Sequence, residues 1–321
     1  MTKVLITGGG GMIGQTIARQ LADEGLSGKT VAKVTLLDLY FPEAGAPRDV
    51  ALQGGLDDAA LMDKALADRP DVIFHLAAAV SGECEKIFDL GWSVNVTHLQ
   101  AMLEQIRALH DADGYTPRLV FASSAAVYGG PLPDVVPDDF HLAPQSSYGA
   151  QKVVGEIMVA DYARKGFMEG VSLRLPTIGV RPGKPNTAAS SCFSGIIREP
   201  LNGHEAILPL PESTMHMHAS PRSAAGFFRH AAVMDLEPLQ GARGIVPPSF
   251  SCTIEEQIEV LRAYAGNDAV SLIRHAPDPL VARIVQGWPK AFAADRARAL
   301  GFTSEINYTE IVKAYVEDYL S

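Results

Sequence analysis

A glycine-rich turn close to the N-terminus constrains the fold of this chain more than any other feature. Residues 3–7 form an apolar run, three glycines at three-residue spacing follow from Gly8, and apolar residues recur at helical spacing over 13–21. The order strand, glycine turn, helix is typical of dinucleotide-binding sites, because glycines let backbone N–H groups approach a pyrophosphate at the positive end of the helix. The alternative is a flexible turn without a ligand. The predicted contact residues are Gly8, Gly11, Met12, Ile13 and Gly14.

A second predicted strand, residues 34–37, ends at Asp38. A carboxylate in this place can accept hydrogen bonds from the adenosine ribose hydroxyls, and its charge would repel the 2′-phosphate of NADP. The residue therefore favours NAD as the cofactor. The alternative is that Asp38 only caps a loop.

Strand and helix patterns alternate over residues 1–175, which predicts a parallel sheet covered by helices on both faces. We expect an α/β fold of the Rossmann type, with a doubly wound parallel sheet in an NAD-binding domain. After Pro176 frequent prolines break the chain into short pieces, as in a smaller substrate-binding lobe over 176–321 that is partly interleaved with the first domain. The expected strands are 71–76, 118–122 and 171–175, and the expected helices are 91–110 and 146–165.

The composition narrows the range of partners. The 321 residues carry a formal net charge of −10, which argues against nucleic acids and anionic membranes. The three cysteines lack the spacing of a metal site and suit a reducing cytosol. His216 and His218 alternate, which is more typical of the exposed side of a strand than of metal ligands. Because no export signal or long apolar run is visible, the sequence predicts a cytoplasmic protein without a metal.

Tyr148 and Lys152 are four residues apart in a predicted helix, so their side chains project from one face. A neighbouring ammonium lowers the pKa of a phenol, which is normally about 10. Tyr148 would then be a usable base for removing the proton of an alcohol. Such a pair also occurs on ordinary helix surfaces. Its weight comes from the glycine turn and from Ser124, which follows the carboxyl end of the predicted strand at 118–122.

Together these motifs resemble an extended short-chain dehydrogenase/reductase of the sugar-nucleotide epimerase and dehydratase group. The matching pieces are Thr7-Gly8-x-x-Gly11-x-x-Gly14, His75 to Ala78, Asn95, Ser123 to Gly129, and Tyr148-x-x-x-Lys152. The resemblance implies that Ser124, Tyr148 and Lys152 are catalytic, with Tyr148 and Lys152 also touching the cofactor. It assigns further cofactor contacts to Leu76, Ala77, Ala78, Asn95, Pro176 and Ile178.

The sequence departs from this group at two points. Gly55 stands where the family often has the aspartate that meets the adenine amine, so we expect Asp57 or the backbone of Leu56 to take its place. Nucleotide-sugar enzymes usually carry an arginine before the histidine of a late segment. Here residues 215–222 have no arginine before the histidines, which argues against a nucleotide sugar as the substrate.

Several segments of the lobe resemble the branch of this group that oxidises D-erythronate, a small sugar acid. The resemblance implies NAD-dependent oxidation of D-erythronate to 2-dehydro-D-erythronate. A forked guanidinium would hold the substrate carboxylate well, and Arg222 is the first candidate. The alternative is that two serines cap a helix while Arg222 lies in a surface ion pair. The predicted substrate contacts are Ser81, Ser124, Asn186, Ser190, Ser191 and Arg222.

Two other functions stay open: a nucleotide-sugar epimerase or dehydratase that retains NAD between turnovers, and an NAD-sensing module without catalysis. By resemblance we also expect a homodimer formed through the helices at 91–110 and 146–165. The apolar residues that could supply its interface are Leu99, Met102, Leu103, Ile106, Val153, Ile157 and Met158.

Overall fold

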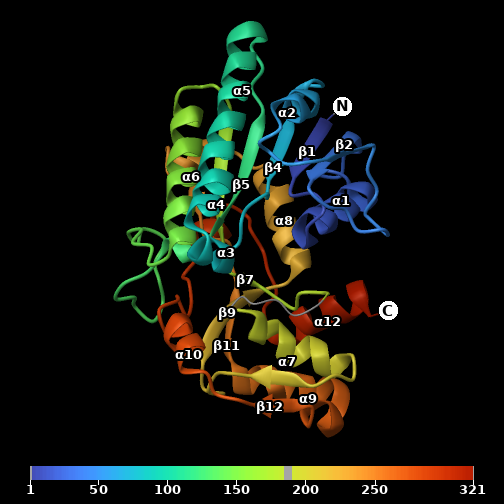
Figure 1. The fold of residues 1–321 in the computed structure, drawn as a ribbon, viewed down its shortest axis with the longest axis vertical. Helices are drawn as coiled ribbons and strands as arrows, with labels where there is room; N and C mark the ends of the chain where they lie inside the picture. Colours follow the sequence, from blue (N-terminus) through green and yellow to red (C-terminus); the bar gives the residue numbers. More distant parts are fainter. Residues whose placement is uncertain (1, 184–189, 321) are drawn as a thin grey trace. The chain divides into compact units, whose positions relative to one another are not determined.

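The structure is a computed structural model that describes residues 2–183 and 190–320 (Figure 1). The chain divides into two compact units, each assembled from three segments. Unit 1 contains the chain up to Val127, together with Ser146–Arg174 and Ala225–Ile245. Unit 2 contains Tyr128–Gln145, Leu175–Ala224 and the chain from Val246 onward.

Unit 1 is built on a seven-stranded sheet with the strand order β10-β6-β5-β4-β1-β2-β3. Strand β1 lies inside the sheet and pairs in parallel with both β2 and β4, so the order of the strands reverses beside β1. Ligands of such sheets bind at this switch point, outside the carboxyl ends of the strands. The fold is the predicted Rossmann type. Its strands are β1 (Thr2–Thr7), β2 (Val31–Asp38), β3 (Val50–Gln53), β4 (Val72–His75), β5 (Arg118–Ser124), β6 (Glu169–Leu175) and β10 (Gly244–Ile245).

Successive strand residues point to opposite faces of this sheet. Helices cover both of these faces. Leu5, Ile73 and Leu119 belong to one buried cluster with residues of α2, α5 and α6. On the other face, the ring of Phe74 meets the ring of Phe228 on α8 edge-on at 6.0 Å. Figure 1 shows α5 and α6 side by side. The main helices are α1 (Met12–Glu24), α2 (Ala59–Leu66), α5 (His98–Asp113), α6 (Ser147–Arg164) and α8 (Pro221–Ala231).

The predicted helix at 91–110 is three pieces in the structure. Helix α4 (Phe88–Trp92) comes first, a π-helical turn over Ser93–Thr97 follows, and α5 then continues to Asp113; the separate helix α3 (Ser81–Lys86) precedes them. Periodicity could not show the π-helical turn, whose buried residue Asn95 contacts Gln151, 56 residues along the chain.

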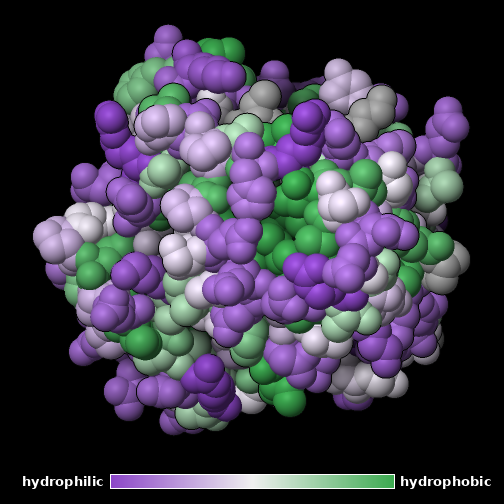
Figure 2. Space-filling view, turned by 90° about the horizontal axis from the view of Figure 1, so that it is seen from below, coloured by the Kyte–Doolittle hydropathy of each residue, from purple (hydrophilic) through white to green (hydrophobic). Residues whose placement is uncertain are grey.

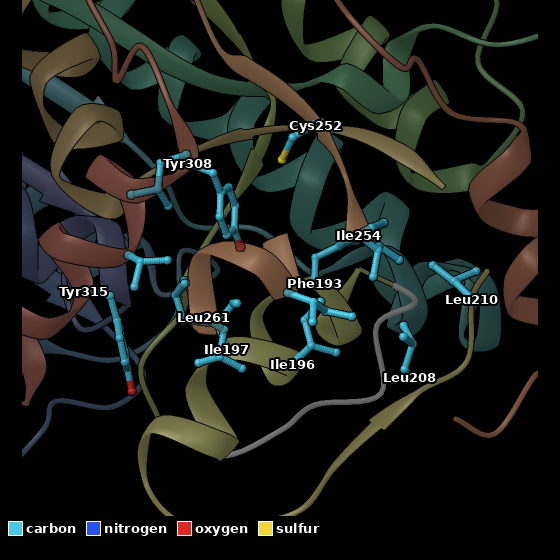
Figure 3. Close-up of a cluster of buried hydrophobic side chains, with 14 of the residues drawn as sticks. Phe193, Ile196, Ile197, Leu208, Leu210, Cys252, Ile254, Leu261, Tyr308 and Tyr315 are labelled. Atoms are coloured by element: carbon cyan, nitrogen blue, oxygen red, sulfur yellow. The ribbon is translucent and has the colours of Figure 1, made fainter. Parts of the chain in front are cut away.

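Unit 2 contains two small sheets and several short helices around an apolar core. Helices α7 (Ser191–Leu201), α9 (Ile254–Val270) and α12 (Tyr308–Tyr319) contribute Phe193, Ile254 and Tyr308 to this core (Figure 3). One sheet has the order β11-β9-β7, and the other pairs β12 with β8. The strands are β7 (Thr177–Ile178), β8 (Ala206–Leu208), β9 (Met215–Ala219), β11 (Phe250–Thr253) and β12 (Ile273–His275), and the remaining helices are α10 (Pro279–Gln286) and α11 (Asp295–Ala299).

The surface is largely polar, and Figure 2 shows hydrophilic residues surrounding a smaller apolar area on one face. Within residues 2–183 and 190–320, no helix is long and apolar enough to cross a membrane. Helix α5 does not offer the apolar surface named above for a dimer, because its apolar residues pack into the core of unit 1. On α6, by contrast, Ile157 is 62% exposed. The buried residues of α5 are Leu99, Met102, Leu103 and Ile106.

Candidate active site

The glycines between β1 and the first turn of α1 leave no room for side chains at several positions. Gly8 has a φ of +74°, and a Cβ atom added there would lie 2.6 Å from the backbone nitrogen of Ala77. A Cβ atom on Gly14 would lie 2.5 Å from the carbonyl oxygen of Gly8. Side-chain carbons do not approach backbone atoms this closely. Only glycine therefore permits the tight turn between β1 and α1.

Asp38 is tied to the glycine turn. Its Oδ2 accepts a hydrogen bond from the Gly10 N–H at 2.9 Å, and its Oδ1 accepts one from the Tyr40 N–H at 3.3 Å. A Cβ atom on Gly10 would lie only 1.9 Å from the carbonyl oxygen of Tyr40. The spacing analysis did not select Gly10, although it lies within the run of four glycines that begins at Gly8.

Gln15 is a second residue of the turn that the motif does not reveal. Its buried side-chain amide donates to the carbonyl oxygen of Gly9 at 2.5 Å and accepts from the N–H of Ala46 at 2.6 Å. One side chain thus holds the turn and the loop after β2 together. No local pattern marks this role, since the two partners of Gln15 lie on opposite sides of it in the chain.

These features fit a dinucleotide. The turn is closed to side chains, α1 begins directly after it at Met12, and the carboxylate of Asp38 stands at the end of β2. The segment after β4 runs beside this turn, because the N–H groups of Leu76 and Ala77 donate to the carbonyl oxygen of Thr7 at 2.9 and 3.1 Å. Leu56, expected to meet the adenine, is 8% exposed in the loop that leads to α2.

Ser124, Tyr148 and Lys152 all belong to unit 1. Ser124 is the last residue of β5, and its Oγ accepts the N–H of Ala126 at 3.1 Å. The Oγ of Ser146 caps α6 by accepting the N–H of Gly149 at 3.1 Å, which places Tyr148 in the first helical turn and Lys152 one turn later. The spacing in the sequence therefore corresponds to one helix face, as predicted.

The ammonium of Lys152 is buried beneath the Tyr148 ring. Its Nζ donates to the carbonyl oxygen of Ala122 at 2.8 Å and lies 5.5 Å from the centre of the Tyr148 ring and 4.8 Å from that of Phe121. Burial lowers the pKa of Lys152 to about 8. Most of the ammonium is therefore charged at neutral pH, close to the phenol whose anion it would stabilise.

Asn95 lies in the π-helical turn, at the centre of a buried hydrogen-bond network. Its Oδ1 accepts the N–H of Ala79 at 2.9 Å, and its Nδ2 donates to Oε1 of Gln151 at 2.8 Å and to the carbonyl oxygen of Ala79 at 3.2 Å. Single π-helical turns occur frequently at functional sites. The turn thus places the Asn95 amide against Ala79, which directly follows the segment 76–78, and against Gln151, which precedes Lys152 in the chain.

The residues predicted for the substrate belong to both units. Ser81 begins α3 in unit 1, whereas Ser190 and Ser191 stand at the start of α7 in unit 2. The Oγ of Ser190 does not cap α7 and instead accepts a hydrogen bond from Nη2 of Arg181 at 3.1 Å. Asn186 lies outside the described residues.

Arg222 lies in the ion pairs that were the alternative expectation. Its Nη2 is 2.6 Å from Oδ1 of Asp318, and its Nη1 is 3.0 Å from Oε2 of Glu317. The Arg222 side chain is 44% exposed. The sequence could not show these pairs, because the partners lie on α12, far along the chain from Arg222.

The prediction that His216 and His218 lie on an exposed side of a strand is wrong, because both are buried in β9, at 2% and 1% exposure. The His216 ring stacks on Phe193 at 4.4 Å and its Nε2 lies 2.6 Å from Oγ1 of Thr177, while Nε2 of His218 lies 3.0 Å from Nε2 of Gln257. Burial lowers the pKa of His216 to about 3. In the described part of the chain, no group of three or more His, Cys, Asp or Glu side chains is placed to hold a metal ion.

Comparisons with known proteins agree with the assignment of this site to a dinucleotide. Residues 4–216 match the NAD dependent epimerase/dehydratase family, and the chain belongs to that family. Family membership confirms the resemblance, the fold class and the cofactor NAD that the sequence predicts. The chain is 46% identical to D-erythronate dehydrogenase of Cupriavidus necator, with 98% of each chain covered.

Two further comparisons extend this result. The chain is 36% identical to D-erythronate dehydrogenase of Haemophilus influenzae, over 98% of this chain and 99% of the relative. Among solved structures, a protein described as the nucleoside-diphosphate-sugar epimerase from Agrobacterium tumefaciens is 48% identical, with a TM-score of 0.94. That match covers 99% of this chain and 94% of the other.

Proposed function

We propose that this protein oxidises D-erythronate to 2-dehydro-D-erythronate with NAD⁺. The observation that carries this proposal is the placement of Lys152 beneath the Tyr148 ring, one helical turn away, with its Nζ bonded to Ala122 in β5, the strand that ends at Ser124. This is an arrangement for proton transfer from an alcohol. The substrate is inferred from the two relatives named D-erythronate dehydrogenase, which align along nearly their whole length.

Tyr148 is the proposed base. Its phenolate accepts the proton of the substrate hydroxyl, and the charge of Lys152 stabilises that phenolate. The Oγ of Ser124 accepts the Ala126 N–H, which leaves its own proton as a donor for the substrate oxygen. NAD⁺, when bound, supplies the acceptor for the hydride. Because the pKa of Lys152 is about 8, its charge is present at neutral pH and is lost in more alkaline solution.

The residues proposed to hold NAD belong to unit 1, except for Pro176 and Ile178 of unit 2. Backbone N–H groups at the start of α1 would bind the pyrophosphate, and Asp38 would accept from the adenosine ribose. Lys152 and Tyr148 would bind the nicotinamide ribose. The other proposed contacts are Gly8, Gly11, Met12, Ile13, Gly14, Leu56, Leu76, Ala77, Ala78, Asn95, Pro176 and Ile178.

The alternative function is epimerisation of a nucleoside-diphosphate sugar, which the description of the Agrobacterium tumefaciens protein favours. The same catalytic trio would serve it, but the NAD would be regenerated within each turnover. The two functions therefore differ in whether NADH accumulates.

The experiment is a measurement of NADH absorbance with purified protein and NAD⁺. D-Erythronate, other aldonic acids, uronic acids and UDP-sugars would be offered separately, with the Tyr148→Phe variant as the blank. Accumulation of NADH with D-erythronate is the expected result. Conversion of a UDP-sugar without accumulation of NADH would replace the proposed function by the alternative.

We further propose a cytoplasmic homodimer. Exposed apolar side chains on contacting helices support it, namely Phe88 and Leu90 of α4 and Ile157 of α6. Sedimentation of the wild type and of the Ile157→Glu variant would test this assembly. A wild-type protein that is monomeric at micromolar concentration would contradict it.

A further inference from the structure

We propose that Glu156 is a positioning residue for Lys152: its carboxylate fastens α6 to the end of β5 and places a negative charge one helical turn from the Lys152 ammonium. The inference rests on the function proposed above and adds to it a residue that no motif of the sequence selected. Every contact that supports it lies within unit 1.

Glu156 continues the helix face that carries the two proposed catalytic residues of α6. It follows Lys152 by four residues, as Lys152 follows Tyr148. Side chains at this spacing are neighbours on a helix. The face is turned inward, since Lys152 is 2% exposed and Glu156 is 6% exposed. A buried carboxylate is costly unless its charge is compensated, so its contacts decide what it does.

Two hydrogen bonds join this face to consecutive residues of β5. Nζ of Lys152 donates to the carbonyl oxygen of Ala122 at 2.8 Å, and Oε1 of Glu156 accepts from Oγ of Ser123. Ser123 is buried and directly precedes Ser124, the last residue of the strand. The two bonds therefore hold the strand end that carries Ser124 against the helix that carries the proposed base.

Two glycines leave the space that this arrangement needs. A Cβ atom on Gly155 would lie 2.7 Å from Cζ of Phe121 in β5, so α6 approaches the strand closely at the residue before Glu156. A Cβ atom on Gly244 in β10 would lie 2.9 Å from Oε2 of Glu156. The carboxylate is thus enclosed by α6, β5 and β10, and its position is fixed by packing.

Glu156 is held in its charged form by Arg174 of β6. Nε of Arg174 donates to Oε1 at 3.0 Å, and Nη2 donates to Oε2 at 2.7 Å. A guanidinium that binds both oxygens stabilises a carboxylate strongly. The side chains of this pair are only 12% and 7% exposed, so salt and water screen it little. Because the two charges partly cancel at a distance, the carboxylate acts mainly on its neighbour in α6, which is Lys152.

Three further titratable groups lie near Lys152: Tyr148 on α6, His75 on β4 and Cys84 on α3. Burial lowers the pKa of His75 to about 3 and raises the pKa of the Cys84 thiol, so both are neutral at neutral pH. Burial lowers the pKa of Lys152 to about 8, whereas Cys84 and Glu156 raise it. Of these two groups only Glu156 is charged at neutral pH, and it therefore limits the loss of the ammonium that burial favours.

The test separates the charge of Glu156 from its reach. Glu156→Gln keeps the length and an accepting oxygen but removes the charge, so Lys152 should lose its proton at a pH lower by roughly half a unit to one unit. Well above pH 8, kcat should then be about three- to tenfold below the wild type, and at the acid end of the profile it should be nearly unchanged. Glu156→Asp keeps the charge but withdraws it from Ser123, so kcat should fall about ten- to a hundredfold at every pH, with the alkaline limb in place.

Two measurements follow this limb: the pH dependence of kcat with D-erythronate, and the pH dependence of NADH affinity by fluorescence. The second needs no substrate, since the anionic cofactor should bind more weakly once Lys152 is neutral. Lys152→Met should bind NADH weakly and without the limb, which assigns the limb to Lys152. Asp161→Asn is the matched control. It also removes a negative charge from α6, but from an exposed pair with Arg164, and both profiles should match those of the wild type.

The variants give distinct outcomes. A limb that stays at the wild-type pH in Glu156→Gln would overturn the inference, and a uniform loss of kcat in both Glu156 variants would show that the residue only supports the fold. If Glu156→Gln does not fold because Arg174 is left unpaired, the double variant with Arg174→Gln removes both charges. It should still move the limb to lower pH by a smaller amount, and an unmoved limb would overturn the inference there as well.

The proposed function can fail separately. A wild-type protein that converts a UDP-sugar without accumulating NADH would refute the oxidation of D-erythronate. The NADH titrations of Glu156→Gln and Asp161→Asn would still decide whether Glu156 controls the charge of Lys152, because they use no sugar acid.

Discussion

The two units differ in how their functional groups are brought together. In unit 1 the decisive contacts are local: Lys152 lies one helical turn from Tyr148, and Gly14 lies six residues from Gly8. In unit 2 they join distant segments, since Thr177 meets His216 across 39 residues and Arg222 meets Asp318 across 96. A sequence pattern determines local geometry directly, whereas it contains no measure of which distant segments will pack together.

The largest effect should come from the local motif of α6. Tyr148→Phe removes the proposed base and should lower kcat by about 10²–10⁴-fold, the usual contribution of a general base. The affinity for NADH should change little, because the phenol acts on the alcohol. Steady-state kinetics with D-erythronate, together with NADH fluorescence titration, measures both quantities.

A Tyr148→Phe variant that keeps more than a tenth of the wild-type kcat would contradict the role of Tyr148 as the base. It would also contradict the claim that local spacing in unit 1 identifies the functional residues. The local motif would then be a packing feature, like the helix pairs found on ordinary surfaces. The neighbouring Tyr162→Phe variant is a suitable control, because Tyr162 lies on the same helix and contacts Glu104.

The same contrast explains how much could be predicted from the sequence. The parallel sheet, the glycine turn and the Tyr148–Lys152 pair follow from periodicity and spacing, which are local properties. Gly10 and Gln15 were missed because their roles depend on contacts with Tyr40 and Ala46, which come from the loop after β2. No periodicity records such contacts.

In unit 2 the sequence did not show whether the side chains of His216 and His218 are buried or exposed. An alternation such as that of His216 and His218 places both side chains on one face of β9, but it does not show that this face is buried, and Met217 on the other face is buried as well. The neighbouring strands and α7 decide that question, since Phe193 covers His216. Arg222 was the first candidate for the substrate carboxylate in the sequence, because its ion pairs with α12 leave no local trace.

The next largest effect is expected at the glycine turn. It tests whether cofactor binding depends on the close backbone contacts of Gly14. A Cβ atom on Gly14 would meet the Gly8 oxygen at 2.5 Å and the Gly9 Cα at 2.8 Å. Gly14→Ala should displace the turn at a cost of about 1–3 kcal/mol and weaken NADH binding about ten- to a hundredfold. Calorimetric titration with NADH measures the loss.

Gly226→Ala is the matched control in the same unit. It lies in α8, and a Cβ atom there would have nothing within 4 Å. Alanine should leave NADH affinity unchanged and stabilise the protein by about 0.5–1 kcal/mol through helix propensity. Equal losses of affinity in both variants would mean that the close approach at Gly14 is not what matters.

A third prediction compares the acid stability of the two units, which bury different numbers of histidines. Unit 1 buries His75, whose pKa burial lowers to about 3, while unit 2 buries both His216 and His218. Between about pH 6.5 and pH 3 an unfolded imidazole binds a proton that the folded one does not, so the free energy of unfolding falls as the pH falls. Each histidine contributes about 1.4 kcal/mol per pH unit in that window.

Unit 2 should therefore lose its structure at a higher pH than unit 1. The chain has two tryptophans, and Trp92 belongs to unit 1 while Trp288 belongs to unit 2. Acid titration of Trp92→Phe would report on unit 2, and the same titration of Trp288→Phe would report on unit 1. Coincident midpoints would show that the units unfold together or that the extra histidine has no influence.

The smallest effect is expected for Asp38. This residue accepts a hydrogen bond from the glycine turn and is also proposed to contact the adenosine ribose of the cofactor. Asp38→Asn keeps an oxygen that can accept the Gly10 N–H but removes the charge that would repel a 2′-phosphate. Repulsion between single charges near water is on the order of 1 kcal/mol, so the ratio of kcat/KM for NADP⁺ to that for NAD⁺ should rise about five- to tenfold. Asp38→Ala also leaves the Gly10 N–H without its acceptor and should weaken both cofactors together. If Asp38→Asn leaves the ratio unchanged while Asp38→Ala weakens both, Asp38 only holds the turn, and its charge does not select the cofactor.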